Sequence, residues 1–157
     1  MTNKIPMFKY DVTDEVIINA SKEAVFNGII EGYDKKISWW VPYLSSMLLK
    51  GNSIAEVDSL CKVTIHGLTP IKFITKTVEV KKNEMLKVIY TKGAFTGEGL
   101  WELKSMGDKT LLRFRWCTNP NNTKIKMIAP FYPIAKRHSK VMQKGFANLK
   151  KKLEPKY

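Results

Sequence analysis

The last forty residues constrain the fold most strongly, because a long amphipathic helical pattern there follows a run of strand patterns. A polar turn at 118–123 precedes a segment that runs from about Lys124 to Glu154. Its inward positions recur at steps of three and four, the spacing that aligns one face of an α-helix. These positions are Ile134, His138, Val141, Met142, Gly145, Leu149 and Leu153. A single long helix must bury this face against the preceding strands, so we expect a curved sheet wrapped around it.

The region from Ser53 to Thr118 has the period-two alternation of β-strands. Turn signals at 58–59, 67–70, 82–84, 92–93 and 106–108 divide it into about six strands that pair as hairpins. One set of alternate positions is apolar and the set between them is largely charged. The apolar set is Val63, Ile65, Leu86, Val88, Tyr90, Trp101, Leu103, Leu112, Phe114 and Trp116. This pattern predicts an antiparallel sheet with only one covered face.

The N-terminal third predicts one strand and two short helices. The first strand is expected from Asp14 to Ala20, and Ser21 then stands at the N-cap position of a short helix. The apolar segment 39–49, with Pro42 near its start, suits a second short helix or an irregular turn. The expected class is therefore α+β, with a curved antiparallel sheet of about seven strands around a long C-terminal helix.

Length and composition are those of a chain that builds one core. With 157 residues, 44% of them hydrophobic, residues 1–157 are expected to form a single domain. No run resembles a signal sequence or approaches the roughly 18 apolar residues that cross a bilayer, so we expect a soluble, cytoplasmic protein. Cys61 and Cys117 lack metal-ligand spacing and are interpreted as buried thiols. No metal and no cofactor are expected.

The formal charge of +13 raises the question of a polyanionic partner. Only three of the 27 basic residues are arginine, the side chain best suited to bidentate phosphate and base contacts. No specific nucleic-acid partner is therefore expected. A row of lysines marks the outer side of the last helix, at Lys136, Lys140, Lys144, Lys150, Lys151 and Lys152. We interpret it as a solvated face, with weak contact with an anionic membrane surface as the alternative.

Two neighbouring stretches resemble a known group of proteins. Residues 93–103 read GAFTGEGLWEL, and residues 107–116 read GDKTLLRFRW. They are similar to the G-x-x-x-G-x-G-x-W-x-L and G-D-x-T-x-L-x-x-x-W runs of the polyketide cyclase/dehydrase-like group in the START-like (SRPBCC) superfamily. Pro130, Pro133 and the run from His138 to Gly145 resemble the start of that group's final helix. The resemblance covers nearly the whole chain and implies the helix-grip fold. It does not specify an activity, because the superfamily includes lipid carriers, hormone receptors, aromatase/cyclases and chaperone activators.

The strand and helix patterns predict which side chains face the space between sheet and final helix. The expected ligand-binding residues are Trp40, Tyr43, Tyr90, Trp101, Trp116, His138 and Met142. The aromatic residues are first of all core residues, and a pocket would be lined by some of them. Gly97 and Gly99 mark a bulge or bend of the sheet, or together with Gly145 they widen the space for a ligand.

His138 is the one candidate for acid or base chemistry, since its helical spacing sets it on or beside the buried face. The plainer interpretation is a histidine that hydrogen-bonds a backbone carbonyl or a loop side chain near Pro130 to Pro133, and His66 is expected to be exposed. The chain has no hydrolase, phosphate-loop or dinucleotide motif. Our leading hypothesis is non-catalytic binding, with transport as its extension, of a hydrophobic small molecule or lipid. The alternatives are a polyketide cyclase/dehydrase-type enzyme that uses His138, and a non-catalytic protein-interaction module.

Overall fold

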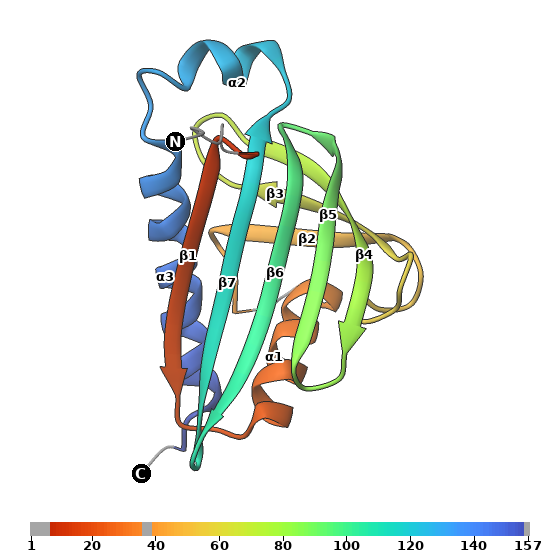
Figure 1. Ribbon diagram of the computed structural model, residues 1–157, viewed down its shortest axis with the longest axis vertical. Helices are drawn as coiled ribbons and strands as arrows, with labels where there is room; N and C mark the ends of the chain where they lie inside the picture. Colours follow the sequence, from red (N-terminus) through yellow and green to blue (C-terminus); the bar gives the residue numbers. More distant parts are fainter. Residues whose placement is uncertain (1–6, 36–38, 156–157) are drawn as a thin grey trace, which may run out of the picture.

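The computed structural model describes residues 7–35 and 39–155, and its main element is an antiparallel sheet (Figure 1). The described residues contain seven strands: β1 (Tyr10–Ile18), β2 (Leu44–Lys50), β3 (Leu60–Ile65), β4 (Ile71–Lys81), β5 (Met85–Gly93), β6 (Phe95–Met106) and β7 (Lys109–Pro120). Their order in the sheet is β1-β7-β6-β5-β4-β3-β2, and all neighbours are antiparallel. Strands β2 to β7 pair with their neighbours in sequence, and β1 closes the sheet against β7.

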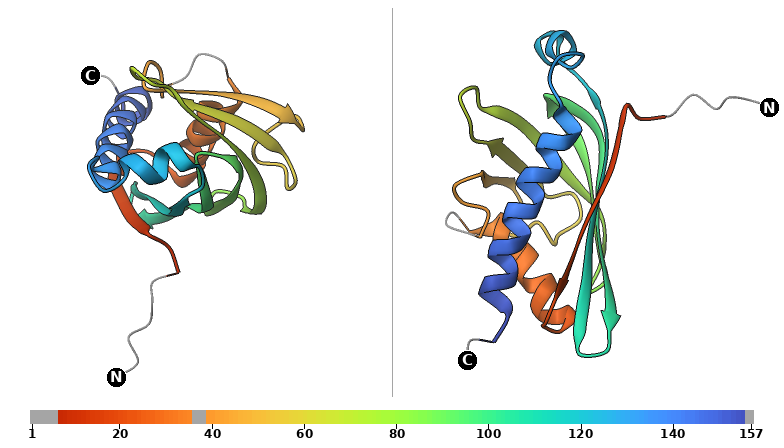
Figure 2. Two further views of the ribbon diagram at one scale, coloured as in Figure 1. Left: turned by 90° about the horizontal axis from the view of Figure 1, so that it is seen from above. Right: turned by 90° about the vertical axis from the view of Figure 1, so that its left-hand side faces the viewer.

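Three helices accompany the sheet in the described chain: α1 (Lys22–Asp34), α2 (Thr123–Ile128) and α3 (Ile134–Leu153). Ser21 is the N-cap of α1, as predicted, and its side chain accepts a hydrogen bond of 3.1 Å from the amide of Ala24. The sheet curves around α1 and α3, which lie on its concave side (Figure 2). The backbone of α3 lies close to β1 and α1. It contacts the central strands β6 and β7 through side chains such as Phe146 and His138.

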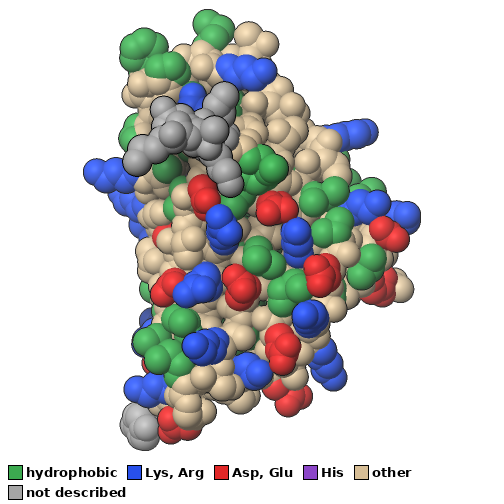
Figure 3. Space-filling model, in the orientation of Figure 1, with side chains coloured by type: hydrophobic (Ala, Val, Ile, Leu, Met, Phe, Trp, Pro, Cys, Tyr) green, Lys and Arg blue, Asp and Glu red, His purple; other side chains and the backbone are tan. Residues whose placement is uncertain are grey.

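The two faces of the sheet differ as the alternation predicts. The concave face carries the predicted apolar set, of which Leu86, Trp101 and Leu112 are fully buried. The outer face carries cross-strand ion pairs, such as Arg115 with Asp11 at 2.7 Å, and Figure 3 shows acidic and basic side chains interspersed over it. The predicted α+β helix-grip architecture with a seven-stranded antiparallel sheet is therefore confirmed.

The prediction of a second short helix at 39–49 is wrong. A turn at 39–43 leads into strand β2, whose residues pair with β3 from Leu44 opposite Ile65 onward. Periodicity does not separate a helix from a strand in so short an apolar run, and pairing with the free edge of β3 decides the outcome. The region from Ser53 to Thr118 consequently supplies five of the described strands rather than six, and β2 completes the seven.

The expected bounds of two other elements also need correction. The first strand runs from Tyr10 to Ile18 rather than from Asp14 to Ala20. The amphipathic segment from Lys124 is divided by a non-helical connection at 129–133, so that α2 precedes α3. Pro130 and Pro133 in this connection lack the backbone amides that a continuous helix would use, which explains the break.

Candidate functional site

Most of the predicted ligand-binding residues meet in one aromatic cluster between the sheet and α3. Trp40, Tyr90, Trp101 and Trp116 are buried, as is Met142 on α3. Trp101 lies at the centre, with its ring centroid 6.1 Å from Trp40, 4.5 Å from Phe114 and 6.1 Å from Phe146. Edge and tilted contacts of this kind add stability beyond the apolar area that they bury.

Tyr43 does not join this cluster. Its side chain is half-buried, and the ammonium group of Lys144 lies 4.9 Å from its ring centroid. This is the distance of a cation–π contact at the molecular surface. The sequence placed Tyr43 with the inward aromatics because it followed Trp40 in an apolar run, but the turn that leads into β2 directs it elsewhere.

His138 lies on the inner flank of α3, where the helical period predicts it. Its ring stacks on Trp116, with centroids 4.1 Å apart and planes 9° apart. His66 is exposed, also as predicted. Burial lowers the pKa of His138 to about 3, because a buried site disfavours the charged imidazolium. The ring is therefore neutral near pH 7.

Asp14 of β1 lies beside His138. Its Oδ2 atom is 3.7 Å from Nδ1 of His138, which is too long for a hydrogen bond. The hydroxyl of Ser139 donates to the same oxygen at 3.1 Å. Asp14 is itself buried, so a carboxylate faces the interior beside an imidazole that it does not hydrogen-bond.

Two buried polar atoms on this inner wall lack a hydrogen-bond partner among the described residues. They are Nδ1 of His138 and the hydroxyl oxygen of Thr118. Thr118 follows Trp116 by two residues in β7, so both side chains lie on the concave face. A buried polar atom without a partner costs about 1–3 kcal/mol. Such atoms in an otherwise aromatic interior mark the place where a polar group of another molecule would be stabilised.

The sequence suggested a hydrogen bond from His138 to a backbone carbonyl or a loop side chain, and Nδ1 makes neither among the described residues. Asp14 and Thr118 also belong to this wall, and neither was among the predicted site residues. A signal for both existed, since Asp14 alternates with Val12 and Val16, and Thr118 continues the series that ends in Trp116. Their polarity favours an outward position, although the alternation of each strand places them inside.

The predicted widening of the space by glycines is not observed. A Cβ atom on Gly99 would lie 2.9 Å from Phe114, and one on Gly145 would lie 2.6 Å from Trp40. Both glycines therefore accommodate aromatic rings. Gly97 fits the prediction of a bend in the sheet. Its φ of +130° disfavours other residues, and an added Cβ atom would clash with the backbone of Cys117 on the neighbouring strand β7.

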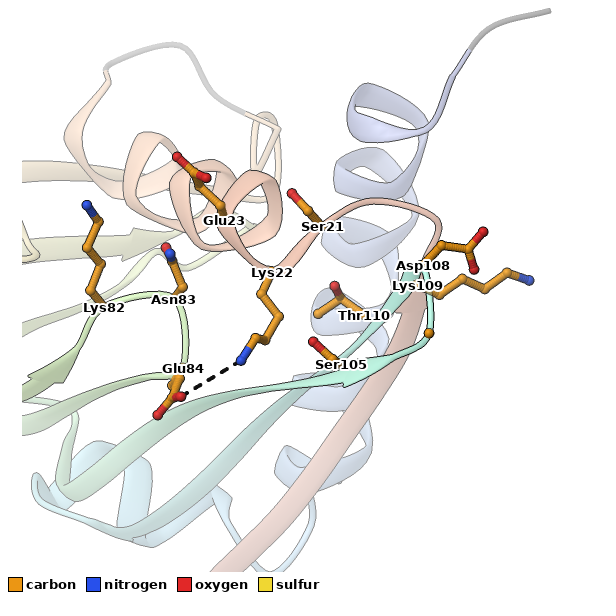
Figure 4. Close-up of a pocket in the computed structure, with 11 residues that line it drawn as sticks. Ser21, Lys22, Glu23, Lys82, Asn83, Glu84, Ser105, Asp108, Lys109 and Thr110 are labelled. Carbon is orange, nitrogen blue, oxygen red and sulfur yellow. Dashed lines mark ion pairs between the residues drawn. The ribbon is translucent and has the colours of Figure 1, made fainter.

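Two surface hollows lie away from the aromatic cluster. The larger, of about 610 Å³, is bounded by the start of α1 and the turns after β4 and β6 (Figure 4). Its lining is polar and charged, and Lys22 points toward Glu84 across it at 3.8 Å. The second, of about 280 Å³, lies on the outer face beside Asp11 and Arg115. Neither hollow lies between the sheet and α3.

The remaining chemical predictions concern cysteines, metals and the membrane. Cys61 and Cys117 are free, buried thiols, and burial raises the pKa of each to about 11. Within residues 7–35 and 39–155 no three His, Cys, Asp or Glu side chains are grouped to hold a metal ion. The helices of this part of the chain are too short or too polar to span a bilayer.

Comparison with known proteins identifies the fold. No protein-family model and no curated protein matches the sequence. Solved structures do match, among them TTHA0849 from Thermus thermophilus, with a TM-score of 0.71 and 13% identity over 92% of this chain and 97% of that chain. A START superfamily protein from Mycobacterium smegmatis has a TM-score of 0.67 and 17% identity, covering 91% and 96% of the two chains. The Aha1 dimer from Colwellia psychrerythraea gives 0.61 and 18%, covering 92% and 96%. The chain therefore has the START-like fold that the sequence resemblance implied.

Proposed function

We propose that the chain acts as a single START-like domain that binds a hydrophobic small molecule or lipid between the sheet and α3. The observation that carries this proposal is the unpartnered pair of buried polar atoms, Nδ1 of His138 and the hydroxyl oxygen of Thr118, in an aromatic interior. The START-like fold supports the same location, since it places a long helix across a concave apolar sheet face.

The polar atoms limit the chemistry of the ligand. A neutral imidazole accepts a hydrogen bond at one ring nitrogen, and a threonine hydroxyl both donates and accepts. The carboxyl group of Asp14 lies close by, and no lysine or arginine is buried among the residues that the structure describes. A ligand with a carboxylate or phosphate would be repelled there. The ligand class that fits best is a flat or elongated apolar molecule with one neutral hydroxyl or carbonyl group.

Rings fill the interior in the conformation described, so binding requires that some of them move apart. The stack of Trp116 on His138 is the part most suited to opening, because it joins the sheet to the first turns of α3. No side chain caps the start of α3 at Pro133. Toward the other end of α3, Phe146 and Leu149 are fully buried, and Lys152 pairs with Glu31 at 2.9 Å. We therefore place ligand entry at the N-terminal half of α3.

The test has two independent parts. Organic extraction of the purified protein followed by mass spectrometry should release an apolar compound with a neutral polar group. Titration with the neutral dye Nile red should give saturable, blue-shifted fluorescence. Thr118→Val should weaken dye binding while the fold is retained, and His66→Asn, at an exposed histidine, should leave it unchanged. A protein that releases no compound and binds no dye would refute the proposal.

One observation supports the enzyme hypothesis as a second candidate. His138 and Asp14 form an imidazole and carboxylate pair on the inner wall, and Nδ1 of the neutral ring has no partner among the described residues. Burial lowers the pKa of the ring to about 3, so a role as general base requires a bound substrate that raises the pKa toward neutrality. A cyclase or dehydrase step on an enolisable ligand would use the ring in this role. Unchanged turnover of an identified substrate by the His138→Ala variant would exclude His138 as the proton acceptor.

A further inference from the structure

Exposed hydrophobic side chains cluster at one end of the molecule. Met127, Ile128, Phe131 and Tyr132, here called the apolar tip, lie within six consecutive residues at the junction of α2 and α3, and Phe131 is 91% exposed. The β3–β4 connection, which carries the fully exposed Leu68, lies at the same end (Figures 1 and 2). Hydrophobic atoms are visible on the surface around α2 in Figure 3. Clustering of this kind distinguishes an interaction site from scattered apolar residues.

The local structure holds the apolar tip outward. Asn122 caps α2 by accepting a hydrogen bond of 2.8 Å from the amide of Ile125, and Ile125 itself is buried. The amide of Phe131 donates to the carbonyl of Ile128 at 3.0 Å, which closes a turn beyond α2. One face of α2 is thus anchored to the body of the protein, and the residues that follow it point away.

The apolar tip is surrounded by positive charge. Lys124 and Lys126 lie on α2, and Lys136, Arg137 and Lys140 lie on the first turns of α3. The sequence has no acidic residue between Asp108 and Glu154, and among residues 7–35 and 39–155 none of these four lysines forms an ion pair. Arg137 stacks over the ring of Tyr132 at 5.0 Å.

In the C-terminal half of α3, by contrast, most lysines contact other groups of the protein. Lys150 pairs with Glu154 at 3.2 Å, Lys152 pairs with Glu31 at 2.9 Å, and Lys144 lies over Tyr43. The lysine row of the last helix is therefore divided. Of its C-terminal members, Lys144, Lys150 and Lys152 contact other groups of the protein and Lys151 is exposed. Its N-terminal members, Lys136 and Lys140, are available beside the apolar tip.

We propose that the apolar tip docks on a membrane surface that contains anionic lipid. Phe131, Met127 and Leu68 enter the boundary between headgroups and acyl chains, while the surrounding lysines contact anionic headgroups. A nucleic acid would use the lysines but not the exposed apolar side chains. A protein partner would use the apolar side chains, but lysine is depleted in protein interfaces. A lipid surface uses both sets of residues.

Docking of the apolar tip brings the N-terminal half of α3 to the bilayer. Exchange of a lipid ligand at that point rests on the proposed function, whereas docking itself does not. Membrane docking and ligand binding can be tested separately, because vesicle binding is measured without any bound ligand and dye binding is measured without vesicles.

The experiment is vesicle flotation with the full chain. Vesicles of phosphatidylcholine alone are compared with vesicles that contain 30% phosphatidylserine, at 0.1 M and 0.5 M NaCl. Phe131→Asp tests the apolar contact, and Met106→Asp is its matched control at an exposed methionine at the opposite end. Lys124→Gln with Lys126→Gln tests the charge, and Lys104→Gln with Lys151→Gln, both exposed and distant from the apolar tip, is the control.

We expect binding to the anionic vesicles, weaker binding at high salt because of screening, and a loss of at least about tenfold for Phe131→Asp. The double lysine variant should lose about 30-fold, at about fivefold per cation. Both controls should bind as the wild type does. Absence of vesicle binding, equal binding to neutral vesicles, or equal losses in test and control variants would overturn the proposal. Circular dichroism of each variant distinguishes lost binding from lost folding.

Discussion

The substitution Gly145→Ala tests whether the space between α3 and the sheet is filled. A Cβ atom at this position would lie 2.6 Å and 2.7 Å from two ring carbons of Trp40 and 3.1 Å from Trp39. Both indoles are buried, and their centroids are 4.1 Å apart in a stack. Neither ring can move away without displacing the other. Overpacking of this kind costs about 1–3 kcal/mol, and two contacts below 3.0 Å with rigid rings place this substitution in the upper part of that range, at about 2–3 kcal/mol. The better helix propensity of alanine returns about 1 kcal/mol.

We therefore expect a net loss of about 1–2 kcal/mol in the free energy of unfolding, measured by urea denaturation. The melting temperature should fall by about 4 °C for a chain of this size. Gly28→Ala is the matched control in α1, because its Cβ would meet only the methyl ends of Leu149 at 2.9 Å and Leu153 at 3.2 Å rather than two stacked rings. That change should cost less than Gly145→Ala. A Gly145→Ala protein as stable as the wild type would show that Trp40 has free space beside it, and the filled interior would be refuted.

Three further substitutions give distinct outcomes. Thr118→Val removes a buried, unpartnered hydroxyl at nearly constant volume, so urea unfolding of the ligand-free protein should show a gain of about 1 kcal/mol; a loss would mean that the hydroxyl has a partner. The pKa of His138 is lowered to about 3 in the folded protein, so the unfolded state binds more protons between about pH 3 and pH 6.5, and stability decreases as the pH is lowered through this window. His138→Phe should reduce the stability that is lost between about pH 6.5 and pH 3 by a few kcal/mol; an unchanged loss would contradict this assignment. Ser21→Ala should cost about 1 kcal/mol through the lost N-cap; unchanged thermal unfolding would contradict this role.

The sheet was predictable because its determinants are local. Strands β3 to β7 form hairpins whose turns carry glycine, asparagine or aspartate, and alternation alone assigned Leu86, Trp101 and Leu112 to the buried face. Strand β2 was not predictable from its own residues. Its apolar run fits a helix or a strand, and the free edge of β3, which begins at Leu60, decides between them. That edge exists only once the rest of the sheet has formed.

The sequence predicts which residues face the interior at the candidate site, but it does not predict the contacts that these residues make with one another. Helical period placed His138 on the inner flank, and strand period placed Trp116 on the concave face. Their stacking, and the approach of Asp14 to 3.7 Å, depend on where α3 crosses β1 and β7. That crossing is set by the lengths of the connections and by the glycines that admit the aromatic rings. No local pattern specifies it.

The two proposals meet at the connection between α2 and α3. Phe131 in the apolar tip precedes His138 by seven residues, and along the helical part of that interval each residue advances only about 1.5 Å. A bilayer that holds Phe131 thus acts within a short distance of the Trp116 and His138 stack, at the end of α3 where no side-chain cap holds the first turn. The opposite end is held by the fully buried Leu149 and by the carboxylate of Glu154, which accepts a hydrogen bond of 3.0 Å from the amide of Asn19. If the apolar tip docks as proposed, α3 is anchored at one end and meets the lipid surface at the other, and we expect docking to separate the stack of Trp116 and His138 before it disturbs the core around Trp101.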